Sequence, residues 1–272
     1  MQTTNILAVA TSVSMDRHFD TLDAIAYAID NGFEGFQAFI NQQIIKDAKL
    51  RGQVRSICED NHLALIAHAP ATLKWTNVSD DSINSAVTNL LASESKALIV
   101  HHYDETVPFE ETLKCLQYLR DRGFTPCLEN FFMRGAETSE KSLRDYLLLL
   151  MEAKDRSIEL MPVFDIPRLY DSQIKLAHMA DLLIENALNV FKLIETPIIL
   201  HLIDTYNDAQ LRSSWCPLGR GIIPYTNILQ QLKQRKIPIY MVILEFEDRI
   251  NPIESKQFLE EHLIGPDSMN VL

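Results

Sequence analysis

Four titratable side chains stand directly after apolar runs of the chain. They are Glu129 after Pro126–Leu128, Asp165 after Ile158–Phe164, His201 after Pro197–Leu200 and Glu245 after Pro238–Leu244. A group of this kind at the end of a buried strand needs a polar partner, because burial of an unpaired charge is costly. Two glutamates, an aspartate and a histidine suit Mg²⁺, Mn²⁺, Co²⁺ or Zn²⁺. We therefore predict one divalent-metal site; the alternative is a hydrogen-bonded polar rim without an ion.

The apolar runs that precede these residues belong to a longer series. Short apolar runs alternate with segments of helical periodicity, and each step spans about 30 residues, the length of one βα unit. The runs are Ile6–Ala10, Glu34–Phe39, Leu63–Ala67, Ala97–Val100, Pro126–Leu128, Ile158–Phe164, Pro197–Leu200 and Pro238–Leu244. Eight such units without a Pro/Gly/Ser-rich linker predict a (β/α)8 TIM barrel that forms a single domain over residues 1–272.

The competing α/β architecture is an open doubly wound sheet. That fold usually has a glycine-rich phosphate loop after its first strand, whereas Ala10–Ser14 contains no glycine. In a barrel, the carboxyl ends of all strands meet at one mouth, so the four titratable residues converge there. Between the strands, the pattern predicts one helix over Gln42–Asn61 and a long polar loop over Leu202–Gly221.

Charge and composition limit the classes of partner. The 272-residue chain has a formal net charge of −12, which argues against a surface that holds nucleic acid non-specifically. No apolar stretch reaches membrane-spanning length, and the first apolar run is too short for a signal peptide. The four cysteines are far apart, as is typical of reduced cysteines. We therefore expect a soluble cytoplasmic protein.

Several short motifs at the strand ends resemble the xylose-isomerase-like TIM barrel superfamily. They are His68-Ala69-Pro70, Leu128-Glu129-Asn130, Phe164–Arg168, His201–Asp204, Leu218–Gly221 and Leu244-Glu245. The superfamily includes sugar isomerases, ketose epimerases, inosose dehydratases and AP endonucleases of family 2. In its isomerases and epimerases, one divalent metal is held by Glu, Asp, His and Glu from the last four strands. The resemblance places these ligands at Glu129, Asp165, His201 and Glu245.

The resemblance also implies substrate contacts and shows one departure. The superfamily usually has D-x-x-H after the sixth strand, but here the fourth position is Arg168, which can bind a phosphate or a carboxylate. His68 and His102 match positions that carry an extra ion in the AP endonucleases; in single-metal members, histidines there contact substrate hydroxyls or are polar fillers. Of the adjacent His101 and His102 only one faces the mouth, and we favour His102. Arg220, in Gly219-Arg220-Gly221, is a further candidate for a substrate contact. This glycine-containing turn either binds phosphate through its backbone N–H groups or is simply a tight turn without a ligand.

These expectations together favour an enzyme that acts on a small carbohydrate. We expect a metal-dependent sugar or sugar-phosphate isomerase or epimerase, in which Glu129 and Glu245 transfer protons and the metal stabilises an enediolate. The alternatives are an inosose-type dehydratase, a non-catalytic binding barrel and an AP-endonuclease-like phosphodiesterase. The last needs clustered metals, yet Asp204–Gly221 contains no histidine. No nucleic-acid or membrane partner is expected, and a homo-oligomer stays open.

Overall fold

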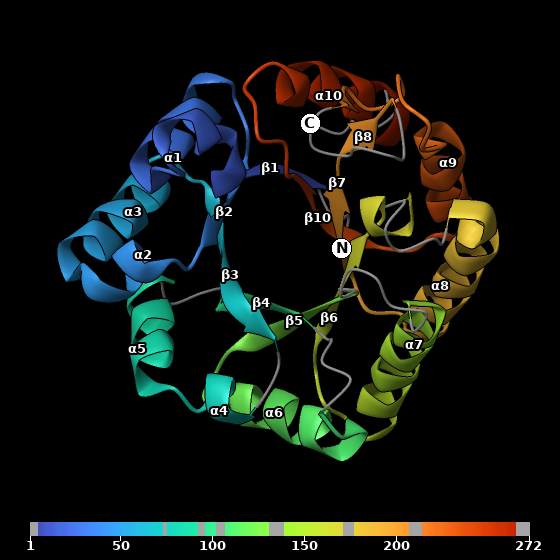
Figure 1. The fold of residues 1–272 in the computed structure, drawn as a ribbon, viewed down its shortest axis with the longest axis horizontal. Coiled ribbons are helices and arrows are strands. Elements are labelled where there is room, and N and C mark those ends of the chain that lie inside the picture. Colours follow the sequence, from blue (N-terminus) through green and yellow to red (C-terminus); the bar gives the residue numbers. More distant parts are fainter. Residues whose placement is uncertain are drawn as a thin grey trace, which may run out of the picture.

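The chain folds into a closed barrel of eight parallel strands surrounded by helices (Figure 1). The computed structural model describes residues 5–72, 75–91, 96–101, 107–130, 139–170, 177–206 and 214–264. Around the barrel the strand order is β1-β10-β7-β6-β5-β4-β3-β2, so β1 and β10 close it. This arrangement confirms the predicted (β/α)8 TIM barrel.

All eight predicted apolar runs are barrel strands. The strands are β1 Ile6–Ala10, β2 Gly35–Phe39, β3 Ala64–Thr72, β4 Ala97–His101, β5 Thr125–Glu129, β6 Met161–Asp165, β7 Ile198–Leu202 and β10 Ile239–Leu244. Three of the strands include the polar residue that the sequence analysis placed beyond their end, namely Glu129, Asp165 and His201. The predicted boundaries are otherwise within a few residues, apart from the longer β3.

The helices pack against the outside of the barrel. They are α1 Thr21–Asp30, α2 Gln42–Lys46, α3 Ala48–Asp60, α4 Trp75–Val78, α5 Asp81–Leu90, α6 Phe109–Asp121, α7 Ser139–Asp155, α8 Ala180–Ile194, α9 Tyr225–Arg235 and α10 Asn251–Leu259. The prediction of a single helix over Gln42–Asn61 is wrong. Asp47 has an extended backbone there, and its side chain accepts a hydrogen bond from the Leu50 N–H, which starts a new helix.

Two apolar clusters lie on the two faces of the barrel sheet. The larger one fills the space between strands and helices. The smaller one comes from alternate positions of the strands, as side chains inside a barrel must. Its members are Ala8, Ala10, Ile66, Ala97, Ile99, Cys127, Val163, Ile199, Met241 and Ile243. This interior cluster lies directly beneath the polar residues at the mouth of the barrel.

The described part of the segment after β7 contains regular structure where the sequence analysis predicted a polar loop. It contains a short antiparallel pair, β8 Asp204–Thr205 and β9 Trp215–Cys216. Buried Asp204 accepts hydrogen bonds from the backbone N–H groups of Thr205, Gly219, Gly221 and Ile223. This carboxylate clamp fixes the turn before α9 and occupies the N–H groups that the sequence analysis considered for phosphate binding.

Two further predictions concern the whole chain. All four cysteines are buried and unpaired, in agreement with reduced thiols. Within the described ranges, no helix combines the length and apolar character needed to cross a membrane.

Candidate metal and substrate site

The interior face of the strands determines which side chains reach the mouth. Side chains on one face of a strand recur every second residue. The mouth residues therefore stand two positions after members of the interior cluster: His68 after Ile66, His101 after Ile99, Glu129 after Cys127, Asp165 after Val163, His201 after Ile199 and Glu245 after Ile243. Six strands thus contribute one polar side chain each to the same end of the barrel.

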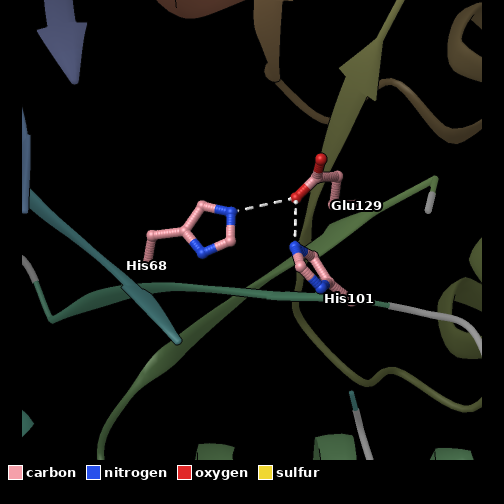
Figure 2. A group of neighbouring side chains, drawn as sticks. All are labelled: His68, His101 and Glu129. Carbon is pink, nitrogen blue, oxygen red and sulfur yellow. Dashed lines mark hydrogen bonds and ion pairs between the residues drawn. The ribbon is translucent and has the colours of Figure 1, made fainter. Parts of the chain in front are cut away.

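Glu129 lies at the centre of the group and has different neighbours at its two oxygens. Its Oε2 lies 3.1 Å from Nε2 of His68 and 3.2 Å from Nε2 of His101 (Figure 2). Its Oε1 faces Nδ1 of His201 at 3.5 Å. The carboxylate is 1% exposed. It therefore lies between two imidazoles on one side and a third on the other.

Asp165 is held by two neighbours. Asn130 on the adjoining strand end accepts from the Asp165 N–H at 2.7 Å and donates to the Asp165 carbonyl at 3.0 Å. The side chain receives Nε of Arg168 on Oδ2 at 2.7 Å. Asn130 is fully buried, so both of these backbone bonds are shielded from water. Asp165 is therefore fixed beside Glu129 and His201 by the hydrogen bonds of its backbone to Asn130 and by the ion pair of its carboxylate with Arg168.

Glu245 closes the group from the side of β10. Its Oε2 lies 3.4 Å from Nδ1 of His201, and its Oε1 accepts a 2.6 Å hydrogen bond from Nε2 of Gln37 on β2. Unlike Glu129, the side chain of Glu245 is 22% exposed and faces the cavity. Both glutamates line the cavity, and Glu245 is the more exposed of the two.

The crowding of carboxylates and imidazoles shifts their pKa values. Burial would raise the pKa of Glu129, but His101 and His201 outweigh it and hold the pKa well below its usual range. Burial raises the pKa of Asp165 to about 7 against the opposing effect of Arg168. For His201, burial acts to lower the pKa, but Glu245 and Glu129 raise it to about 9. A buried site with this much negative charge favours a cation.

The histidines provide the test of whether these residues fit a metal ion. Both ring nitrogens of His201 are buried without a hydrogen-bond partner among the described residues, and its carboxylate neighbours are too distant for well-formed hydrogen bonds. His68 Nδ1 lies 2.9 Å from the Ala69 carbonyl, to which it must donate. The lone pair of neutral His68 at Nε2 then points at a carboxylate, an arrangement that requires a proton or a cation between them.

Two overlapping groups of ligand atoms can accept an ion. Glu129, Asp165 and His201 form one group, and His68, His101 and Glu129 form the other. Within each group the ligand atoms lie within 4.8 Å of one another. Oxygen and imidazole donors of this kind suit Mn²⁺, Mg²⁺, Co²⁺ or Zn²⁺. The residues therefore fit a divalent metal, and Glu129 is common to both groups.

A cavity of about 640 Å³ opens above the polar group. Its wall carries aromatic and apolar side chains from the β1, β2 and β7 loops, among them Phe19, Phe39 and Trp215. Phe39 also packs beside the His68 ring, with 5.7 Å between centroids. Such a cavity, with an apolar wall and a polar floor, has the form of a small-molecule site.

Not all of the remaining predicted substrate contacts line the cavity. Arg168 lines the cavity. Arg220 is not among the described lining residues; its side chain is 64% exposed and pairs with Glu254 at 3.0 Å. The choice of His102 over His101 is not supported, because His101 occupies the interior position next to Glu129. His102 itself lies outside the described residues.

Sequence reasoning missed two residues of the site. Gln37 and Asn130 do not titrate, so a search for acids, bases and metal ligands passes over them. Gln37 sits in a run that the sequence presents as apolar, and Asn130 follows directly after Glu129 in a strand-end motif. Period-two spacing within β2 places Gln37 on the same face as Gly35 and could have identified it, whereas it gives no signal for Asn130.

Comparison with known proteins supports the fold. No protein-family model and no curated protein sequence matches the chain. Among solved structures, 283 chains match. A xylose isomerase-like TIM barrel/4-hydroxyphenylpyruvate dioxygenase fusion protein superposes with a TM-score of 0.65 at 14% identity, over 98% of this chain and 45% of that one. The chain thus spans less than half of the fusion protein.

Two single-barrel structures match over nearly their whole length. The probable 3-DHS dehydratase AsbF from Bacillus anthracis has a TM-score of 0.62 and 14% identity, covering 94% of this chain and 99% of that one. D-Allulose 3-epimerase from Methylomonas sp. has a TM-score of 0.60 and 12% identity, covering 95% and 98%. The chain thus shares the TIM barrel fold of these xylose isomerase-like structures, the fold that the resemblance at its strand ends implied.

Proposed function

We propose that this protein is a divalent-metal-dependent isomerase or epimerase of a small sugar. The observation that carries the proposal is the buried His201. Its two ring nitrogens lack hydrogen bonds within the described chain, and Nδ1 faces two carboxylates at 3.4 and 3.5 Å. The ion would be held by Glu129, Asp165, His201 and Glu245. Structural neighbours named as sugar epimerases support the substrate class.

The chemistry follows from the different surroundings of the two glutamates. When bound, a divalent ion supplies a Lewis acid that stabilises the negative charge of an enediolate. Glu129 is enclosed by three imidazoles and has its pKa held low, so it acts as a ligand and a poor base. Glu245 is open to the cavity and is the group that removes a proton from the substrate carbon and returns it. The sequence analysis had assigned this role to both glutamates equally.

The second proton-transfer group is then one of the two histidines beside Glu129. His68 and His101 both line the cavity. Nε2 of His68 and Nε2 of His101 lie 3.1 and 3.2 Å from the same Glu129 oxygen, and the two ring centroids are 4.9 Å apart. Return of the proton to the same carbon from this side gives epimerisation, whereas return to the neighbouring carbon gives isomerisation.

Solvent exchange tests this proposal. The Mn²⁺-loaded protein is incubated in D₂O with a panel of free ketoses, and the products are followed by NMR. We expect deuterium at the carbon next to the carbonyl of the accepted sugar, because a carboxylate that removes a proton and faces water exchanges it. Loss of water from the substrate would instead indicate a dehydratase. Absence of both reactions across the panel, with metal bound, would favour the non-catalytic barrel.

A further inference from the structure

A polar side chain on β2 contacts the proposed base from two strands away. Gln37 and Glu245 are 208 positions apart in the chain, and the Gln37 amide nitrogen donates to Glu245 Oε1 at 2.6 Å. The amide orientation is set by chemistry, since the carboxylate can only accept. With Oε1 occupied by Gln37, Glu245 presents Oε2 toward His201.

The backbone around Gln37 is built to support this contact. The side chain of Thr11 donates to the Gln37 carbonyl at 3.1 Å and accepts from the Phe39 N–H at 3.1 Å. On the intervening strand β1, the interior positions are Ala8 and Ala10, and Ala10 pairs directly with Gln37. These short side chains leave the space through which Gln37 reaches Glu245.

The carbonyl oxygen of the same amide lacks a partner in the described part of the chain. Gln37 is 3% exposed and lines the cavity, and its Oε1 has no hydrogen-bond partner among the described residues. A buried carbonyl oxygen without a donor costs free energy. Because Gln37 lines the cavity, a ligand O–H or N–H placed there would satisfy this acceptor.

We propose that Gln37 is a positioning residue for Glu245 and a specificity contact that accepts a hydrogen bond from a substrate hydroxyl. This inference rests on the proposed function, because it assigns to Glu245 a role at the metal and at the substrate. It narrows the substrate to a sugar that carries a hydroxyl beside the atom that Glu245 deprotonates. A sugar without that hydroxyl leaves Gln37 Oε1 unpaired and binds less tightly.

The test begins with Gln37→Met, which keeps the length of the side chain and removes both polar atoms. Gln230→Met, at an exposed position on α9, is the matched control. Mn²⁺ binding is measured by calorimetry, and the visible spectrum of the Co²⁺-loaded protein reports the ligand geometry. We expect roughly 10- to 100-fold weaker Mn²⁺ binding and an altered Co²⁺ spectrum in Gln37→Met alone, the usual effect of losing a partner of a metal ligand. Should Gln37→Met fold poorly, Gln37→Asn is used in its place. Asparagine keeps the amide but is one methylene shorter, so it places the amide farther from Glu245.

Hydroxyl recognition is tested with free ketoses and their single-deoxy analogues by saturation-transfer NMR. Wild-type protein should bind one ketose about tenfold more tightly than one of its deoxy analogues, and Gln37→Met should remove that difference. Unchanged discrimination in Gln37→Met, or no ketose bound by the wild type, overturns the hydroxyl contact. Equal Mn²⁺ affinity and equal Co²⁺ spectra in wild type and Gln37→Met overturn the positioning role. A wild type that binds no divalent ion at all refutes the proposed function itself.

Discussion

Nε of Arg168 lies 2.7 Å from Oδ2 of Asp165, three residues earlier in the chain, at the edge of the cavity. The pair places the arginine charge against a carboxylate. The other charged residues that line the described part of the cavity are all acidic: Glu129, Asp204, Glu245 and Glu247. Even with one divalent ion bound, the floor of the cavity stays negative, which disfavours an anionic ligand.

We therefore predict that a free ketose binds more tightly than its phosphate ester. The comparison is made by NMR at low ionic strength with the Mg²⁺-loaded protein, and it includes Arg168→Met and Arg220→Met. Arg220→Met is the control, because Arg220 pairs with Glu254 at an exposed position. Tighter binding of the phosphate ester, lost in Arg168→Met but kept in Arg220→Met, would show that Arg168 binds phosphate after all.

Replacement of a metal ligand should abolish metal binding and leave the barrel folded. Asp165→Ala and His201→Ala each remove one donor from the group around Glu129. Native mass spectrometry with Mn²⁺ should find the ion in wild type and not in either variant, with circular dichroism unchanged. His62→Ala, at an exposed turn, is the control. Occupancy near two ions per wild-type chain would mean that the His68 group is also filled.

Glu245→Gln should reduce turnover of an identified substrate by about 10²-fold or more, the usual contribution of a general base. Glutamine keeps the size and one oxygen, so Mn²⁺ binding should weaken much less than turnover. We expect Glu129→Gln to weaken Mn²⁺ binding more than Glu245→Gln does, because Glu129 is proposed as a ligand and not as the base. Full activity in Glu245→Gln would contradict the assignment of the base.

The metal-free protein should lose stability as the pH rises. The pKa of His201 is about 9 in the folded chain against an ordinary 6.5, and that of Asp165 is about 7 against 3.8. Raised values mean that the folded state holds these protons more tightly, so their contribution is present at low pH and disappears as pH passes through the folded pKa values. With EDTA, Tm should fall between pH 6.5 and 9. Saturating Mn²⁺ should reverse the trend, since the ion competes with the same protons. A flat Tm with EDTA would contradict the shifted pKa values.

Gly221→Ala should destabilise the turn held by Asp204. An added Cβ at Gly221 would overlap the Asp204 carboxylate and the Thr205 carbonyl, so the clamp must open. Each bond from a backbone N–H to a charged oxygen is worth about 1.5–3 kcal/mol, and we expect a loss of at least that size in urea unfolding. Gly52→Ala, in the middle of α3 with open space around it, should instead stabilise by about 0.5–1 kcal/mol. An unchanged free energy of unfolding in Gly221→Ala would mean that the turn shifts to make room for the added methyl group.

The fold and the four residues that we propose as metal ligands were accessible from sequence because they rest on local signals. Apolar runs at βα spacing predicted the strands, and a titratable group at the end of a run identified Glu129, Asp165, His201 and Glu245. The choice between His101 and His102 was not accessible. Ala97–Val100 is apolar at every position, since one face meets the barrel interior and the other the helices, so the run does not show which face is which.

Three side-chain contacts could likewise not be predicted from the sequence. The contact of Gln37 with Glu245 depends on barrel closure through β1, and the break at Asp47 depends on one side chain that caps α3. The Arg168–Asp165 pair is local, yet the sequence did not tell whether the arginine faced a carboxylate or a ligand. Each outcome depends on a contact of one side chain: Gln37 with Glu245, Asp47 with the Leu50 N–H, and Arg168 with Asp165.

The strand order around the barrel has a consequence for assembly. Glu245 enters the site only when β10 has paired with both β7 and β1, the contact that closes the ring. Every potential ligand comes from a different strand, and an unclosed chain brings only part of the set together. The four-residue metal site that we propose is therefore complete only after the ring has closed. Glu129, Asp165 and His201 come from the neighbouring strands β5, β6 and β7, so these three can meet before closure and Glu245 is the ligand that depends on it.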